Sequence, residues 1–252
     1  PNTESIHVIL MASPDSVDPN PLRWTYYAYS TNGGWTWNNF GNVRVPGRRS
    51  GFPVLDLGQG PISCGAIIAN HNVEGAAGVQ SFVYIDYPVG GGAFSELAPR
   101  PSFGNDEPIW PEIAGCSDGS IVLVASRSAA GSTHLTRTSD YLSWSPYVQI
   151  TNMLATATVA EANPSGRVGV VSASSGLQWL ESTNNGMTWP PTPSELLPPF
   201  IVSGSDTFVM TSGLDFVYKG INPVVTFGVT RLVNGLMTHR HSGIGVWRRG
   251  GG

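Results

Sequence analysis

A short turn sequence that occurs more than once is the feature that most limits how this chain can fold. Residues 30–37 read STNGGWTW and residues 182–189 read STNNGMTW, with Ser, Thr, Asn, Gly, Thr and Trp in the same register. An asparagine side chain can accept hydrogen bonds from the backbone N–H groups that follow it, which closes a tight turn. Glycine tolerates the positive φ of such a turn, and tryptophan packs into a core as the next strand begins. The two segments therefore predict equivalent strand–turn–strand units.

More divergent copies of the turn lie between and after these two. Residues 138–144, TSDYLSW, keep the hydroxyl, the acid and the tryptophan but lack the glycine. Asp86 lies midway between Asn32 and Asp140 and begins a stretched copy, with Phe94 in place of tryptophan. Residues 241–247, HSGIGVW, fit a further eroded copy. Turns that recur about every 50 residues between short β-like segments predict a repeated sheet architecture.

These turns resemble the Asp-box, or bacterial neuraminidase repeat, whose pattern is S/T-x-D-x-G-x-T/S-W. The resemblance is carried by Ser30, Asn32, Gly34, Trp37, Asp140, Trp144, Ser182, Asn184, Gly186 and Trp189. It implies an all-β, sialidase-like β-propeller in which the box residues are structural and lie away from the active-site mouth. We expect a single domain of about five four-stranded blades, at roughly residues 1–47, 48–104, 105–151, 152–204 and 205–252.

Apolar segments mark the strands of these blades. Residues 6–10, 121–124 and 168–171 are predominantly apolar, which predicts strands buried on both faces. Residues 52–55 and 110–113 each set a proline near the start of an apolar segment, which predicts the first strand of a blade. The first repeat has no such segment. Either the ring closes without a full first blade, or the chain is part of a larger ring.

Composition excludes several function classes. Charged residues make up 12% of the chain and the net charge is −4, which excludes an electrostatic footprint for DNA or RNA. A hydrophobic fraction of 40% disfavours disorder, and no apolar stretch is long enough to span a membrane. Low charge favours a secreted or cell-surface protein. The chain begins at Pro1 without a signal-peptide pattern, which is typical of a processed protein or a fragment.

Cysteines, histidines and acidic turns give no cofactor site. Cys64 and Cys116 are either two buried thiols or one disulfide, and no zinc-ligand spacing is present. The remaining candidate ligands are Asp15 and Asp18, which could hold calcium in a loop, and His239 and His241, which alternation puts on one strand face. A plain turn and surface histidines are the favoured interpretations, so we expect no cofactor.

The sialidase resemblance raises an enzyme hypothesis that the sequence disfavours. The family places its first substrate-binding arginine two residues before a proline, and the matching positions here are Gly51 and Ile109. Arg48 and Arg49 are nearby but out of register, and a bidentate clamp depends on geometry. The adjacent Asp106–Glu107 pair is expected to lie in a solvated loop rather than to act in hydrolysis.

The resulting hypothesis is a non-catalytic, extracellular propeller that binds a glycan or protein at its face or between blades. Aromatic side chains of Trp24, Tyr26, Tyr27 and Trp179 could line such a groove, although packing between blades is favoured. The alternatives are a sialidase-type glycoside hydrolase and a self-assembling structural subunit of a surface layer or filament, in which open blade edges contact other chains.

Overall fold

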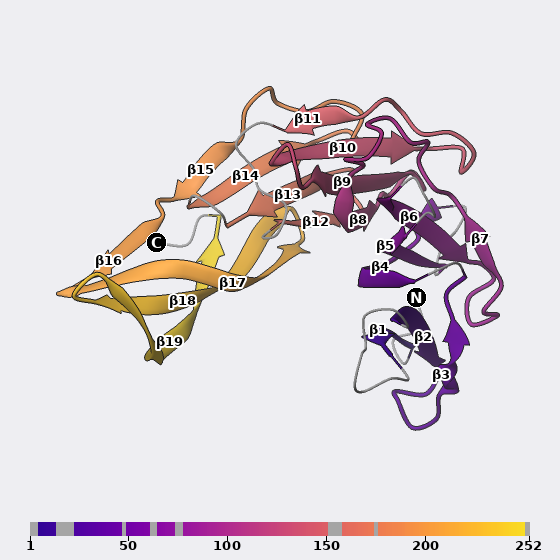
Figure 1. Cartoon of the computed structure of the whole chain (residues 1–252), viewed down its shortest axis with the longest axis horizontal. Helices are drawn as coiled ribbons and strands as arrows, with labels where there is room; N and C mark the ends of the chain where they lie inside the picture. The colour runs from indigo at the N-terminus through magenta and orange to yellow at the C-terminus, as the bar shows by residue number, and fades with distance from the viewer. Residues whose placement is uncertain are drawn as a thin grey trace.

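The computed structural model describes residues 5–13, 23–46, 49–60, 65–73, 78–150, 158–173 and 176–249. Their regular elements are all β-strands, arranged in five antiparallel sheets that follow one another along an arc (Figure 1). The predicted all-β propeller is thereby confirmed. Figure 1 also shows that the first and fifth sheets lie at opposite ends of the arc rather than beside each other.

The first three sheets follow the predicted repeats. The first contains β1 (Ile6–Ala12), β2 (Trp24–Ser30) and β3 (Asn38–Arg44). The second contains β4 (Ser50–Leu57), β5 (Ala66–Val73), β6 (Val79–Asp86) and β7 (Phe94–Glu96). The third contains β8 (Ile109–Gly115), β9 (Ile121–Arg127), β10 (Ser132–Thr138) and β11 (Val148–Ile150). The predicted first strands are therefore present as β4 and β8, and within the described residues the first sheet has three strands where the others have four.

The fourth and fifth sheets complete the arc. The fourth contains β12 (Thr158–Ala162), β13 (Val168–Ser172), β14 (Leu177–Ser182) and β15 (Ser194–Leu197). The fifth contains β16 (Phe200–Ser203), β17 (Asp206–Lys219), β18 (Asn222–Val233) and β19 (Leu236–Arg248). It thus begins five residues before the predicted boundary at residue 205.

The fifth sheet departs from the predicted repeat. Residues 241–247 lie inside β19, where Ser242 pairs with Thr230 and Arg248 pairs with Val224. The predicted fifth copy of the turn is therefore wrong. The segment lacks the asparagine or aspartate that would accept backbone N–H groups, so the ladder to β18 continues through it.

Among the residues that the structure describes, four hydrophobic clusters form the core, one between each pair of successive sheets. Ile113 and Leu123 of the third sheet, for example, pack against Ile67 and Val83 of the second. The second strands β9 and β13 are buried along most of their length, as predicted. The prediction fails for β1, where Ile6 remains 38% exposed, because β1 is the edge of its sheet.

The two ends of each sheet, at which its strands begin and finish, can be distinguished by the turns that lie there. The first strands β4, β8 and β12 lie along the inside of the arc, and β4 and β12 each contact β8 (Figure 1). We call one end the box end, because the third strands finish there and lead into the Asp-box turns. At the other, the far end, the first strands begin, as the pairing of Gly51 with His71 and of Ile109 with Ser126 shows.

Candidate functional site

The two clear box turns are closed by the same hydrogen bonds. Ser30 Oγ accepts the backbone N–H of Gly34 at 2.9 Å, and Asn32 Oδ1 accepts that of Thr36 at 2.9 Å. The corresponding distances in the second box are 3.0 Å for Ser182 with Gly186 and 3.0 Å for Asn184 with Thr188. In each box the serine hydroxyl also donates to the asparagine. These hydrogen bonds close the turn and account for the shared spacing of serine, asparagine and glycine within each box.

The divergent turns reach closure by different atoms. Asp140 accepts the Ser143 hydroxyl and the backbone N–H groups of Ser143 and Leu142, and these bonds hold the pKa of its carboxyl well below the usual range. Asp86 accepts the backbone N–H of Gly90 at 2.8 Å. That bond spans four residues, as the Ser30 to Gly34 bond does, so Asp86 takes the place of the box serine rather than that of the box aspartate.

The box tryptophans lie close to the core. Trp144 and Trp189 are partly buried against the hydrophobic clusters on either side of the third sheet, and Trp37 is also partly buried. The indole N–H of Trp189 donates to Gly186 O at 3.0 Å, which ties the tryptophan back to its own turn.

At the far end a group of basic and aromatic side chains converges, which we call the far-end cluster. It consists of Arg23, Arg49, Phe52, His71 and Trp110. The Phe52 ring lies 4.9 Å from that of His71 and 6.5 Å from that of Trp110, with the Arg23 guanidinium 5.6 Å above it. The cluster joins the first three sheets on the side away from the box turns.

The guanidinium of Arg23 lies directly beside Gly51. Its Nε donates to Ser50 O at 3.2 Å, and a β-carbon on Gly51 would lie 2.8 Å from its Nη2. Gly51 is the residue two before Pro53. The sequence hypothesis treated that position as empty, whereas the structure brings a guanidinium to it from the neighbouring sheet.

Two aromatic residues of the cluster share an unusual backbone conformation. Phe52 has φ of 49° and Trp110 has φ of 53°, and each precedes a proline within a β-bulge. A left-handed φ costs a non-glycine residue about 1–2 kcal/mol, and such strain concentrates at functional sites. The bulges turn both rings out of their ladders and toward each other at the far end.

Burial and, after it, the positive charges of Arg23 and Arg49 lower the pKa of His71 to about 4, which favours its neutral form at neutral pH. Its Nδ1 is buried without a hydrogen-bond partner among the described residues, as is the Oδ1 of each neighbour, Asn70 and Asn72. The end of β5 thus carries three consecutive polar side chains with unused hydrogen-bonding atoms.

Two acidic residues from different sheets, Glu112 on β8 and Asp215 on β17, interact through their charges. Glu112 follows Trp110 and Pro111 on β8, and alternation places it on the face opposite the buried Ile113. Burial and, to a smaller extent, the charge of Asp215 on β17 raise the pKa of Glu112 to about 8. Asp215 is exposed and accepts the N–H of Phe216. At neutral pH the raised pKa favours the protonated form of the Glu112 carboxyl.

Other buried or paired acids have structural partners instead. Asp56 accepts the N–H groups of Leu57 and Gly115, which links β4 to β8, and burial raises its pKa. Asp106 pairs with Arg127 at 3.2 Å in the loop before β8. Glu107 accepts the N–H of Ser102 at 2.8 Å. The expected solvated loop is wrong for Glu107, which is 5% exposed. Its carboxylate accepts a backbone N–H group rather than facing solvent.

The remaining predicted side chains fall into two groups. Tyr27 and Trp179 are buried between sheets, so the packing interpretation holds for them. Cys116 is buried, with Sγ 3.8 Å from Ala114 O, whereas Cys64 lies outside the described residues, and their pairing stays a prediction. Asp15 and Asp18 also lie outside them, as do the side chains of His239 and His241.

Within the part of the chain that the structure describes, no three His, Cys, Asp or Glu side chains gather in a way that could hold a metal ion. The described residues also contain no helix of the length and apolar character that a membrane crossing requires.

Comparison with known proteins identifies the fold and leaves the family open. No protein-family profile and no curated protein matches the sequence. Among solved structures, a Hadza microbial sialidase superposes with a TM-score of 0.55 at 11% identity, over 90% of this chain and 47% of that one. The chain thus spans about half the length of that sialidase.

Two further structures align over nearly the whole chain. The catalytic domain of a Coprinopsis cinerea α-L-arabinofuranosidase gives a TM-score of 0.54 at 12% identity, over 97% of this chain and 86% of that one. A Dyadobacter fermentans protein of unknown function gives 0.59 at 14% identity, over 99% and 81%. The fold is therefore that of the sialidase-like propellers, and two of these three neighbours are named as glycoside hydrolases.

The sequence hypothesis did not select the residues that the candidate site uses. Arg23, Glu112 and Asp215 lie in different sheets and have no shared motif. One signal was available for Glu112, since it interrupts an apolar strand directly after the Trp110–Pro111 pair. No comparable signal marked Arg23, whose position depends on the packing of the first sheet against the second.

Proposed function

We propose that this chain forms the catalytic propeller of a glycoside hydrolase, with Glu112 as its general acid and the far-end cluster as its substrate-binding surface. The observation that carries the proposal is the Glu112 carboxyl on β8, directly after the Trp110–Pro111 bulge, whose pKa is raised to about 8 by burial and then by the charge of Asp215. A carboxyl that keeps its proton near neutral pH can act as the general acid of glycosidic bond cleavage, and Asp215 on another strand is the candidate second carboxyl.

The chemistry assigns a different role to each carboxyl. Glu112 donates its proton to the glycosidic oxygen as the bond from that oxygen to the anomeric carbon breaks. The Asp215 carboxylate either removes a proton from an attacking water or itself attacks the anomeric carbon, with water releasing the sugar in a second step. The anomer formed first, observed by NMR, distinguishes these two routes.

The far-end cluster suits an acidic sugar. Arg23 and Arg49 supply positive charge, and among the described residues the Nη groups of Arg23 have no hydrogen-bond partner. Phe52, which is 49% exposed, and Trp110 offer ring surfaces beside them. A guanidinium binds a carboxylate more strongly than a neutral group. We therefore expect glycosides of a sialic or uronic acid to be better substrates than neutral glycosides.

The fold neighbours support a hydrolase more than the non-catalytic binder that the sequence favours. The sialidase and the arabinofuranosidase carry their activities on this fold, although fold alone does not fix activity. Binding without hydrolysis is the competing outcome of the test. An extracellular location remains an expectation.

Hydrolysis assays test the assignment. The protein is given methylumbelliferyl glycosides of sialic acid, glucuronic acid and arabinofuranose, and the corresponding alkyl glycosides. For an acidic substrate we expect turnover that Glu112→Gln lowers by about 10²–10⁴-fold. The loss should be greater for alkyl glycosides, because an alcohol leaving group needs the proton more than a phenol does.

Matched variants control for charge and folding. Glu195→Gln changes an exposed glutamate on β15, and Asp206→Asn changes an aspartate on the same strand as Asp215. Both should keep full turnover, whereas Asp215→Asn should lose it. Turnover that is equal in wild type and Glu112→Gln, or no turnover of any glycoside, contradicts the proposal. Binding of an acidic glycoside without turnover restores the non-catalytic hypothesis.

A further inference from the structure

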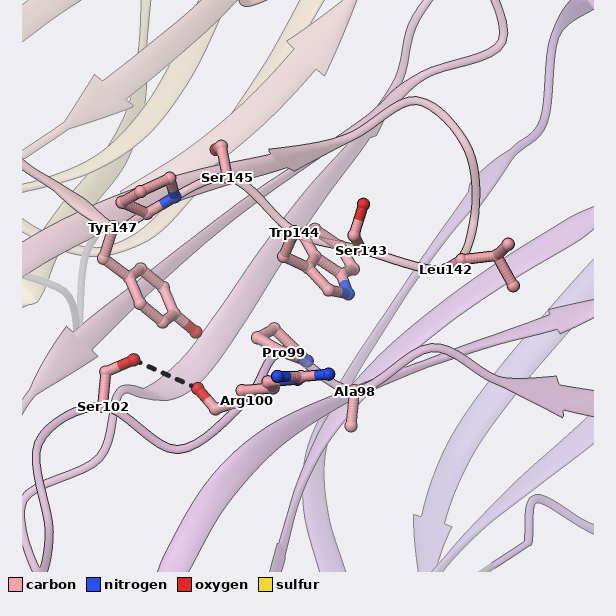
Figure 2. Close-up of a pocket in the computed structure, with 10 residues that line it drawn as sticks. Ala98, Pro99, Arg100, Ser102, Leu142, Ser143, Trp144, Ser145 and Tyr147 are labelled. Atoms are coloured by element: carbon pink, nitrogen blue, oxygen red, sulfur yellow. Dashed lines mark hydrogen bonds between the residues drawn. The ribbon is translucent and has the colours of Figure 1, made fainter.

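A pocket of about 540 Å³ lies on the outer wall of the arc, between the second and third sheets. One side is the segment after β7, including Pro99, Arg100 and Ser102, and the other is the segment before β11, including Trp144 and Tyr147. Figure 2 shows these two segments facing each other, with the Tyr147 hydroxyl directed toward residues 99 and 100. None of the pocket residues belongs to the far-end cluster.

The aromatic walls of the pocket are fixed in place. The indole N–H of Trp144 donates to Leu97 O, and the ring packs on the hydrophobic cluster between the two sheets. The Tyr147 ring lies 5.7 Å from Phe103 and 6.2 Å from His134. Burial and the charge of Glu107 raise the pKa of Tyr147, so its hydroxyl keeps its proton. A ligand therefore meets surfaces that need little ordering on binding.

Arg100 supplies a positive charge that the described residues do not neutralise. Its side chain is exposed and makes no ion pair or hydrogen bond within the described part of the chain, where its backbone oxygen accepts the Ser102 hydroxyl. Other arginines are paired, namely Arg127, Arg137, Arg167, Arg231 and Arg249. Glu107, the nearby acid, is buried and accepts backbone N–H groups. The charge of Arg100 is thus available to an anion.

We propose that this pocket is a second binding site, which holds an anionic sugar residue of a glycan chain. Its size lies within the range of small-ligand sites, which is about 300–1,000 Å³. Trp144 and Tyr147 offer apolar ring surface to the C–H groups of a sugar, Ser102 offers a hydroxyl, and Arg100 pairs with a carboxylate or a sulfate. The site does not depend on the proposed hydrolysis, because it shares no residue with Glu112, Asp215 or the far-end cluster.

Calorimetric titration tests the site in Glu112→Gln protein, so that turnover does not interfere. The probes are digalacturonate, galactose 6-sulfate and the neutral disaccharide galactobiose. We expect the acidic probes to bind and Arg100→Gln to weaken that binding about tenfold or more. Arg248→Gln, which removes an exposed arginine on β19, should leave it unchanged. The carboxylate and sulfate probes show which anion the pocket prefers.

Three results would overturn the second site. One is equal binding by the parent and by Arg100→Gln. Another is binding of galactobiose as tight as that of digalacturonate. The third is binding that persists in Arg100→Gln and disappears in Arg23→Gln, which would assign the acidic sugar to the far-end cluster alone. That third result would leave the proposed hydrolase intact, so the two proposals can fail separately.

Discussion

The guanidinium of Arg23 occupies the space that a side chain at position 51 would need, since a β-carbon on Gly51 would lie 2.8 Å from Nη2. The two residues belong to neighbouring sheets, and the backbone of Ser50 holds Arg23 through Nε. The absence of a side chain at Gly51 therefore leaves the space in which the Arg23 guanidinium lies. The missing family arginine at position 51 does not mean that the far end lacks a guanidinium there.

Gly51→Ala tests this relationship. The added methyl group meets the flexible tip of Arg23 rather than backbone, so we expect Arg23 to move at a stability loss of less than about 1 kcal/mol. Activity on an acidic glycoside, or binding of it, should fall about tenfold or more. Thermal unfolding and kcat/KM, or Kd, separate the two effects. Gly243→Ala, where the nearest atom is 3.8 Å away, is the matched control and should change neither.

Glu112 makes the stability of the protein decline as the pH rises from about 4.5 to about 8. Its folded pKa of about 8 lies above the reference value of 4.5, so the folded chain keeps a proton that the unfolded chain releases. The free energy of unfolding should therefore fall between about pH 4.5 and pH 8, by at most about 1.4 kcal/mol per pH unit. Denaturant unfolding at pH 5 and pH 8 should show a smaller fall in Glu112→Gln. If the free energy of unfolding changed with pH equally in wild type, Glu112→Gln and Glu195→Gln, the raised pKa of Glu112 would be refuted.

His71 acts in the opposite direction. Its folded pKa of about 4 lies below the reference value of 6.5. Between these pH values the unfolded chain therefore binds a proton at His71 that the folded chain does not bind. The contribution of His71 to stability is present above pH 6.5 and is lost as the pH falls toward 4. His71→Gln should therefore lose less stability than wild type over this interval. Arg23→Gln should reduce the loss in part, because it removes one of the charges that keep His71 neutral.

Gly186 has two separate reasons to be glycine. Its φ is 75°, and a β-carbon there would overlap Val122 Cγ2 of the third sheet. Gly131 has φ of 60°, and no atom lies within 4 Å of the point that its β-carbon would occupy, so it isolates the backbone effect. We expect Gly186→Ala to destabilise the protein by about 1–3 kcal/mol more than Gly131→Ala, through overpacking. If both variants lost the same free energy of unfolding in a denaturant titration, the added methyl group at position 186 would be accommodated without overpacking against Val122.

The sequence predicts the fold well where local chemistry repeats. The serine, asparagine and glycine of the boxes each act within four residues along the chain, so their pattern is readable without tertiary structure. The prediction fails at residues 241–247, where a glycine–tryptophan resemblance lacks the side-chain acceptor that closes the turn. Similar spacing is no substitute for that acceptor.

The candidate site is less predictable because its parts come from different sheets. The positive φ of Phe52 and Trp110 follows from bulges that the sequence does not reveal. The raised pKa of Glu112 depends on burial and on Asp215, which lies two sheets away along the chain. Such relationships exist only after the sheets have packed, so composition and spacing carry no trace of them.

The separation of Glu112 and Asp215 has a consequence for synthesis of the protein on the ribosome. Glu112 belongs to the third sheet and Asp215 to the fifth, and the fourth sheet must fold between them. In the proposed hydrolase, a nascent chain with three folded blades would carry the aromatic and basic residues of the far end before Asp215 reaches Glu112. The proposal therefore implies that glycan binding develops before hydrolysis during translation.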